Sequence, residues 1–505
     1  MSVTTQDRYG KAQEVVEGID NGVQPTLSVT LENGAEIIGT SQHRILMLND
    51  ALEMVWRRLD EVLPGGIAVR RVGDNLWATT PFLLPASPDC DAYGSVRNLV
   101  HITPPAVVTP EMGLFLGMLM SSGAVLETGV TLTSIDQEVR EQFCTLASTL
   151  FNVSSYVRVD ACENTPYVVI NSRLLSRWLL QIGVPRYHDD NRIPNCILQS
   201  PRPVVEAFLR GYTLDGYFAV DSGWVHLCST VSRRMAKDIA SVLWNLGYDV
   251  CLRPKQECPL SLTDMDGDYR QHQFAVYVKR EGAERFIEEI GFLEEWKNKT
   301  TREALQRSRS GGHESNSVPA AKIQAYYTSN RHRYTSERLQ SVMETVPSLI
   351  SVDILREFFS DVDFIAPLLD AKLRFTQVVE VVEGPTVPTF DVSIAVSHEY
   401  VANSVVVHNT LKYKPDIVPF HHFQEMVLKY QHQVRCCSVM PQEDTSSYEY
   451  LPEQRITEEE YHALKAGLVQ NVFKKAEVKE EIGREHVDCG TGGACPIDFN
   501  SGSKV

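Results

Sequence analysis

The chain has 505 residues, a length typical of three to four domains. Hydrophobic residues make up 43% and aromatic residues 9%, which excludes a generically disordered chain. Lys and Arg number 48 against 65 Asp and Glu, so a net charge of −17 argues against a simple basic nucleic-acid coat, although one local groove is compatible with it.

The sequence has no apolar run of about 18 residues and no apolar N-terminal stretch, so we expect no membrane span and a cytoplasmic location. Eleven cysteines in a chain of this length are too sparse for a disulfide framework, and reduced thiols are expected.

The first 100 residues are predicted to be β-rich. Residues 26–31 alternate in polarity and predict a strand. The segment Glu32-Asn33-Gly34 is typical of a hairpin turn, and residues 36–40 are predicted to form the second strand of the hairpin. From about residue 105 to 310 apolar helical patterns alternate with short β-like runs, which predicts a mixed α/β domain. The helices are expected at 113–120, 139–151, 174–182, 204–211 and 233–246, and strands at 168–170, 225–230 and 274–278.

Residues 308–317 are rich in Ser and Gly and predict a linker, and the region 311–370 has no clear assignment. A β pattern returns within 371–409, mainly from 375 to 407. Residues 410–505 form an appended segment with helical patterns and a tail that contains Gly and Cys. The order is therefore β piece, α/β insert, linker region, β piece and C-terminal segment.

The run from Thr389 to Thr410 ends in Val407-His408-Asn409-Thr410. An asparagine amide can attack the carbonyl carbon of its own residue, which cleaves the backbone and forms a succinimide. A preceding histidine can polarise that carbonyl or protonate the leaving amine, and a threonine that follows offers a hydroxyl nucleophile. A strand pair that ends in a polar turn is the plain structural alternative.

This run resembles the C-terminal splicing blocks of inteins. The resemblance implies that Asn409 cyclises, that His408 assists it and that Thr410 is the first residue of the C-extein. It also implies that His398 and Asp391 support transesterification and proton transfer.

A second match lies at Gly39-Thr40-Ser41-Gln42-His43, which fits the T-x-x-H block of inteins. There Thr40 and His43 are expected to contact the N-terminal scissile peptide, although such a pair also occurs by chance in hairpins. The resemblance implies that the pieces 1–100 and 371–409 close into one all-β Hint splicing domain.

The first intein block, which begins with a Cys or Ser nucleophile, has no match. The first cysteine is Cys90, and Ser2 lacks the surrounding block. We therefore expect splicing to need an N-terminal piece, either a separate polypeptide or a part lost by truncation of the gene model, with truncation favoured.

Within 105–310, residues 110–123 resemble the first helix of LAGLIDADG homing endonucleases. Residues 192–194 followed by 207–216 resemble the second helix. The resemblance implies an α/β fold in which two helices pack at small residues and an acid at each C-terminal end holds Mg²⁺ against double-stranded DNA. Ordinary core packing is the alternative for either helix alone.

The nuclease match departs from the family at its chemistry. Ser122 stands where the first acid is expected, so Asp215 is the one candidate metal ligand and nuclease carboxylate. Residues 232–310 contain 14 Lys and Arg against 13 Asp and Glu, so no basic stripe stands out. A decayed nuclease kept as a passive insert is favoured over an active one.

The segments 416–423, 434–442 and 488–497 resemble the C-terminal end of an adenosylcobalamin-dependent ribonucleotide reductase. The resemblance implies an α/β segment whose Cys489 and Cys495 shuttle electrons to the active site and are re-reduced by a thioredoxin-type protein. A metal ligand pair or two idle thiols are the alternatives. A triphosphate substrate is favoured over a diphosphate.

The resulting hypothesis is a multidomain intein precursor within a ribonucleoside-triphosphate reductase. Splicing itself needs no cofactor. Adenosylcobalamin belongs to the complete reductase, and we do not expect this chain to bind it or to reduce ribonucleotides alone. An active DNA endonuclease and a non-functional gene fragment are the alternatives.

Overall fold

The computed structural model describes residues 3–88, 100–159, 164–186, 191–215, 220–221, 224–255, 273–307, 316–394 and 397–408, with single residues at 425 and 462. The chain divides into two units, Met1–Leu411 and Lys412–Val505. Nearly all of the second unit lies outside the described residues, as do Asn409, Thr410, Cys489 and Cys495. No helix in the described part has the length and apolar character that a membrane crossing requires.

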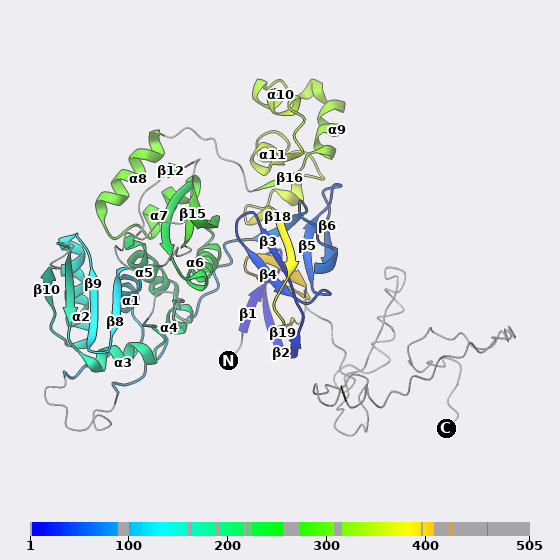
Figure 1. The fold of residues 1–505 in the computed structure, drawn as a ribbon. Helices are drawn as coiled ribbons and strands as arrows, with labels where there is room; N and C mark the ends of the chain where they lie inside the picture. The colour runs from blue at the N-terminus through cyan, green and yellow to red at the C-terminus, as the bar shows by residue number, and fades with distance from the viewer. Residues whose placement is uncertain are drawn as a thin grey trace, which may run out of the picture. The chain divides into compact units, whose positions relative to one another are not determined.

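Two segments far apart in the sequence build one β-rich domain (Figure 1). Its larger sheet has the strand order β20-β21-β5-β7-β18-β3-β4, with β6 paired to β5. The first segment supplies β3 (Leu27–Leu31), β4 (Glu36–Gly39), β5 (Arg44–Leu48), β6 (Met54–Arg58), η1 (Leu59–Glu61) and β7 (Ile67–Arg71). The second segment supplies β18 (Leu373–Glu383), β20 (Glu399–Ala402) and β21 (Val405–His408).

A three-stranded antiparallel sheet completes this domain. It contains β1 (Val3–Gln6), β2 (Ala12–Gln24) and β19 (Val387–Ile394), with β2 in the centre. β19 pairs along most of β2, from Val387 opposite Gln24 to Ile394 opposite Val15. Both sheets therefore join the two predicted β pieces into a single domain.

The long insertion between β7 and β18 is compatible with this sheet because its two ends meet. Arg71, the last residue of β7, pairs directly with Leu373, the first residue of β18. The intervening 301 positions, 72–372, thus leave the sheet and return to it at neighbouring positions. Insertions are tolerated at such sites because the host strands keep their register.

The insert has two halves with the same order of elements. The first half contains α1 (Pro110–Ser122), β8 (Gly123–Leu126), β9 (Gly129–Thr133), α2 (Gln137–Phe151), β10 (Tyr156–Val159), β11 (Pro166–Ile170) and α3 (Arg173–Gln181). After α4 (Asn195–Leu198), the second half contains α5 (Arg202–Tyr212), η4 (Thr213–Asp215), β12 (Val220–Asp221), β13 (Trp224–Thr230), α6 (Arg233–Asn245), β14 (Val250–Lys255), β15 (Gln273–Lys279) and α7 (Arg280–Glu289). α8 (Glu295–Arg307) follows. The first half holds a four-stranded sheet of order β10-β11-β9-β8, and the second half holds one of order β12-β13-β15-β14. The five helices predicted from the sequence are all present.

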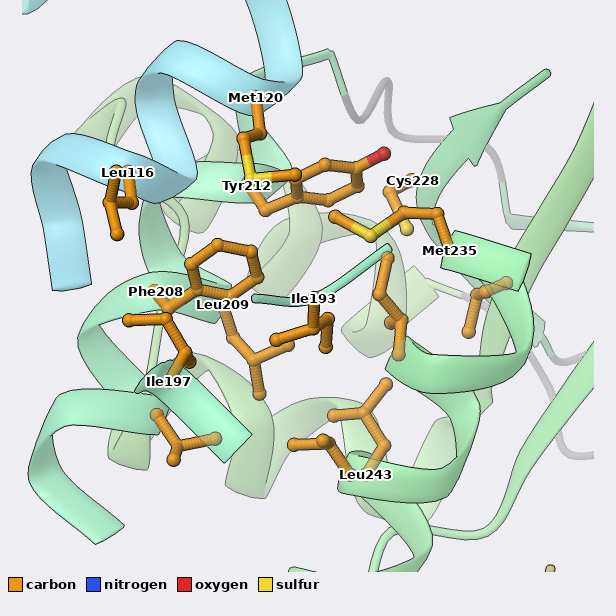
Figure 2. Close-up of a cluster of buried hydrophobic side chains, with 14 of the residues drawn as sticks. Leu116, Met120, Ile193, Ile197, Phe208, Leu209, Tyr212, Cys228, Met235 and Leu243 are labelled. Carbon is orange, nitrogen blue, oxygen red and sulfur yellow. The ribbon is translucent and has the colours of Figure 1, made fainter. Parts of the chain in front are cut away.

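The helices α1 and α5 pack with their backbones in contact. A Cβ atom added at Gly117 would lie 2.1 Å from the carbonyl oxygen of Phe208, and one at Gly211 would lie 2.5 Å from that of Leu114. Glycine is therefore required at this crossing, as predicted for two helices that pack at small residues. Figure 2 shows part of the hydrophobic core, where Met120 of α1 lies beside Tyr212 of α5 and near Met235 of α6.

Residues 316–370, which the sequence pattern left without a clear assignment, form a folded element. It contains β16 (Ser317–Pro319), α9 (Ala321–Ser329), η5 (Arg331–Arg333), α10 (Glu337–Glu344), β17 (Leu349–Ser351), α11 (Val352–Phe358) and η6 (Ala366–Leu368). Its buried Ile323, Leu355 and Phe359 belong to one hydrophobic cluster with Leu46 and Val69 of the β-rich domain. The helices have only seven to nine residues, too few to show a clear period in sequence.

Candidate functional site

A cavity of about 1020 Å³ opens in the β-rich domain and is lined by both of its sequence segments. Thr40 and His43 reach it from the first segment, and Asp391 and His408 from the second. The structure therefore brings together four of the seven residues predicted to take part in splicing. One of them, His408, is the residue directly before Asn409 in the sequence.

Thr40 and His43 lie in the turn between β4 and β5. The His43 backbone N–H donates to the Thr40 carbonyl at 3.0 Å, and the His43 carbonyl accepts from the Leu59 N–H at 2.9 Å. Burial lowers the pKa of His43, the neighbouring Asp391 opposes that effect, and His408 lowers the pKa further. A histidine with a lowered pKa is neutral at physiological pH and able to accept a proton.

Asp391 is 6% exposed on β19, opposite Ile19 of β2. Its carboxylate accepts a hydrogen bond from the side chain of Tyr400. Burial and the Asp391 charge raise the pKa of the Tyr400 hydroxyl above its ordinary value. Tyr400 therefore keeps its proton and holds the carboxylate in the cavity wall.

His408 ends β21, opposite Glu399 of β20 and Arg44 of β5. Its ring meets the Trp56 ring edge to face, with centroids 4.9 Å apart and planes at 87°. The Arg8 guanidinium lies 5.0 Å from the Trp56 centroid and pairs with the Glu399 carboxylate at 2.6 Å. This stack fixes the imidazole next to the chain position that Asn409 occupies.

The other predicted residues are placed differently. His398 has a backbone φ of 56° directly before β20 and is not among the residues that line the cavity. Asn409 and Thr410 lie outside the described residues.

Tyr400 and Trp56 were missed by the sequence reasoning. Tyr400 follows His398 by two residues and belongs to the recognised run. Trp56 had no sequence signal, because its partner His408 is distant in the chain.

The nuclease-like residues lie at the ends of the crossing helices. Ser122 is the last residue of α1, whereas α5 ends at Tyr212 and a 3-10 turn continues to Asp215, whose side chain is not described. Among the described residues, no three His, Cys, Asp or Glu side chains gather in a metal-binding group. A serine hydroxyl does not replace a carboxylate on a hard cation, so these residues do not fit a two-carboxylate Mg²⁺ site.

The protein-family model for the intein splicing domain matches residues 2–409 of this sequence. The match covers well over half of the chain, and the protein belongs to the family of intein splicing domains. The two-segment β-rich domain and its cavity both lie inside the matched range.

Replication proteins are among the relatives of this chain. The replicative DNA helicase DnaB of Nostoc sp. is 21% identical over 447 residues, which are 80% of this chain and 45% of that protein. A DNA gyrase polypeptide of Mycolicibacterium flavescens is 24% identical over 426 residues, 80% of this chain and 69% of that protein. The chain thus spans about half the length of the helicases it matches.

Among solved structures, I-DmoI in complex with DNA and Mn is similar to 36% of this chain and 97% of its own, at 15% identity and a TM-score of 0.27.

Replacing Asp391 by asparagine is expected to lower the pKa of His43 further. The carboxylate raises this pKa, so its loss leaves burial and the His408 charge unopposed. A titration of the His43 imidazole by NMR measures the shift, and the neutral form should then persist to lower pH. The matched change Asp353→Asn, at an exposed acid outside the cavity, should leave His43 unchanged. An unshifted His43 in the Asp391 variant would contradict the arrangement.

Proposed function

We propose that residues up to Asn409 excise themselves from a longer polypeptide and join the segment that begins at Thr410 to an upstream extein. The cavity carries this proposal, because it gathers Thr40, His43, Asp391 and His408 from two segments more than 300 residues apart. Such convergence of predicted residues from separate motifs is not required by packing alone.

The C-terminal step is proposed as follows. The Asn409 side-chain amide nitrogen attacks the Asn409 carbonyl carbon, the C–N bond to Thr410 breaks, and the Thr410 amine leaves with a proton. His408, held edge to face on Trp56, is the group nearest in sequence to polarise that carbonyl or supply the proton. The product is a succinimide at the end of the intein.

The joining step uses Thr410. The upstream nucleophile first takes the extein acyl group from the scissile peptide bond, whose amine leaves. The Thr410 hydroxyl then attacks that ester or thioester and the upstream nucleophile leaves as its free hydroxyl or thiol; the new ester rearranges to a peptide bond once the Thr410 amine is free. Thr40 and His43 act on the upstream scissile bond, where neutral His43 accepts the proton of the attacking nucleophile. We propose that a further N-terminal piece carries that nucleophile.

The insert is proposed to be a decayed homing endonuclease. The paired halves and the glycine-mediated crossing of α1 with α5 support a nuclease ancestry, and Ser122 at the end of α1 argues against a complete metal site. Cutting of double-stranded DNA that contains the uninterrupted insertion site, with Mg²⁺ and with loss of cutting in Asp215→Asn, would instead establish an active nuclease.

The segment from Thr410 is proposed to be the C-terminal end of an adenosylcobalamin-dependent ribonucleoside-triphosphate reductase of the cytoplasm. Its Cys489 and Cys495 would carry electrons from a thioredoxin-type reductant in the complete enzyme. Replacement of Cys489 by serine in the spliced reductase should stop thioredoxin-linked turnover while a small dithiol reductant still supports it.

The intact mass of the chain tests splicing directly. Expressed alone, the chain is expected to remain at 56.8 kDa. With the upstream region joined to it, a ligated product and a free intein should appear. Absence of processing in both settings would overturn the proposal.

A further inference from the structure

The insert and the β-rich domain share an extensive polar contact through α6 and β14. The Leu252 N–H of β14 donates to the Asn33 carbonyl at 2.8 Å, and the Gly73 N–H, two positions after the end of β7, donates to the Trp244 carbonyl of α6 at 2.7 Å. Gly34 has a φ of 81°, and a Cβ there would lie 2.3 Å from the Leu252 carbonyl oxygen. The predicted hairpin turn is thus fitted against the insert by its glycine.

A buried arginine of β7 depends on this contact. Arg70 is 0% exposed, and its counter-ion is Asp249, which precedes β14 of the insert, at 3.5 Å. Trp244 of α6 lies 5.2 Å from the guanidinium. Burial lowers the pKa of Arg70 to about 10, and Asp249 opposes that shift. A buried cation without its counter-ion is strongly destabilising.

Arg70 in turn holds the turn between β20 and β21. Its Nε donates to the Ser404 hydroxyl at 2.9 Å, and the neighbouring Arg71 N–H donates to the Ser404 carbonyl at 2.7 Å. Arg70 therefore contacts both Asp249 of the insert and Ser404 of the turn.

A second connection reaches the same turn from α6. The Glu36 carboxylate pairs with Lys237 and with Arg233 at 3.4 Å. Burial would raise the pKa of Glu36, but hydrogen bonds from Lys237 and Ser28 outweigh it and leave the pKa lowered. The Glu36 backbone carbonyl accepts from the Asn403 amide at 2.9 Å.

The turn has a left-handed backbone at both of its central residues. Asn403 and Ser404 have φ values of 47° and 66°, as a two-residue type I′ hairpin turn requires; Asn is favoured in such turns, whereas Ser404 stands where glycine is usual and costs free energy. The turn joins the strand that carries Tyr400 to the strand that ends at His408, and Asn403 lines the cavity. Surrounding contacts must therefore hold the turn in this conformation.

We propose that the insert positions the Asn403–Ser404 turn, and with it His408, through Asp249 and Lys237. In this proposal the insert contributes to the geometry of the splicing site, which replaces the hypothesis that the insert is passive. Asp249 and Lys237 are positioning residues because they act through Arg70 and Glu36. The consequence for splicing rests on the proposed function, whereas the structural coupling stands without it.

Hydrogen exchange of the backbone amides of residues 400–408, followed by mass spectrometry on the full chain, tests the coupling. Asp249→Asn and Lys237→Met are each expected to speed exchange at least about tenfold, since each removes a partner of a buried charge. Glu303→Gln breaks an exposed i,i+4 pair of the insert that does not contact the β-rich domain, and should leave exchange unchanged. Unchanged exchange in both test variants would overturn the proposal.

A double variant separates positioning from simple stability. Arg70→Met with Asp249→Leu removes both charges of the buried pair. Arg374, which also pairs with Asp249 at 3.6 Å, is 20% exposed and can be solvated, so thermal stability should recover relative to Asp249→Asn. The bond to Ser404 stays lost, so fast exchange at 400–408 should persist. If thermal stability and slow exchange at 400–408 were both restored, Arg70 would matter only for folding, and the proposed positioning of the turn would be refuted.

Release of the segment that begins at Thr410, assayed with the upstream piece present, should be slower in the variants in which amide exchange is faster. If the parent chain never cleaves, the proposed function is refuted. The amide-exchange experiment would still test the structural coupling between the insert and the turn.

Discussion

Replacement of Asn409 by alanine is expected to abolish release of the 96-residue segment from Thr410 to Val505. Alanine has no side-chain amide, so the backbone bond after residue 409 has no internal nucleophile, and no other group of the chain can form the succinimide. Intact mass with the upstream piece present measures the release. The upstream acyl transfer to Thr410 should still proceed, so a branched product should accumulate.

A matched control is Asn171→Ala, at an exposed asparagine of the insert, which should splice like the parent. His408→Ala should give an intermediate result. It keeps the amide nucleophile but loses the proton donor, so cleavage is expected to slow by about 10²–10⁴-fold rather than stop. Normal release from Asn409→Ala would contradict the asparagine mechanism altogether.

Sequence reasoning predicted those residues because the splicing chemistry depends on a contiguous run. Asn409 and its neighbours must be adjacent in the chain for cyclisation and transfer, so their order is visible without a fold. The long amphipathic helices, such as α2 and α6, were equally visible from their period. Chemistry that depends on adjacent residues and helices with a clear period can therefore be predicted from the sequence.

Contacts between distant residues leave no such trace. The pairs Arg70 with Asp249 and Trp56 with His408 join positions about 180 and 350 residues apart, and each residue alone is unremarkable. The helices of region 316–368 are short, and their burial depends on a sheet face built from other segments. Only the fold reveals that the insert contributes to the environment of the splicing cavity.

This dependence bears on how such an insert is retained. A nuclease that has lost its chemistry is expected to lose its fold as well, unless the fold serves the host. Here Asp249, between α6 and β14, is a counter-ion of the buried Arg70, and Leu252 of β14 donates a backbone hydrogen bond to the Asn33 carbonyl in the turn between β3 and β4. Loss of the insert would remove Asp249 from the buried Arg70 and the Leu252 donor from Asn33, so the proposed positioning role predicts that the core of the insert is retained.

That core should be sensitive at the helix crossing, and Gly117→Ala is the sharpest test. The added methyl group would lie 2.1 Å from the Phe208 carbonyl oxygen and 2.9 Å from the Tyr212 nitrogen. Both are backbone atoms, so α1 and α5 must move apart, and the cost should exceed the gain of about 1 kcal/mol in helix propensity. We expect a net loss of about 3 kcal/mol or more in the free energy of unfolding, measured by denaturant titration.

The control for this variant is Gly18→Ala, an exposed position with no heavy atom within 4 Å of the added methyl, where the change should stay within about 0.5 kcal/mol. If the insert supports the splicing cavity, Gly117→Ala should also speed amide exchange at residues 400–408. Unchanged stability would show that the helices are not in backbone contact. A destabilised insert with fully protected amides at 400–408 would show instead that the β-rich domain holds its cavity without the insert.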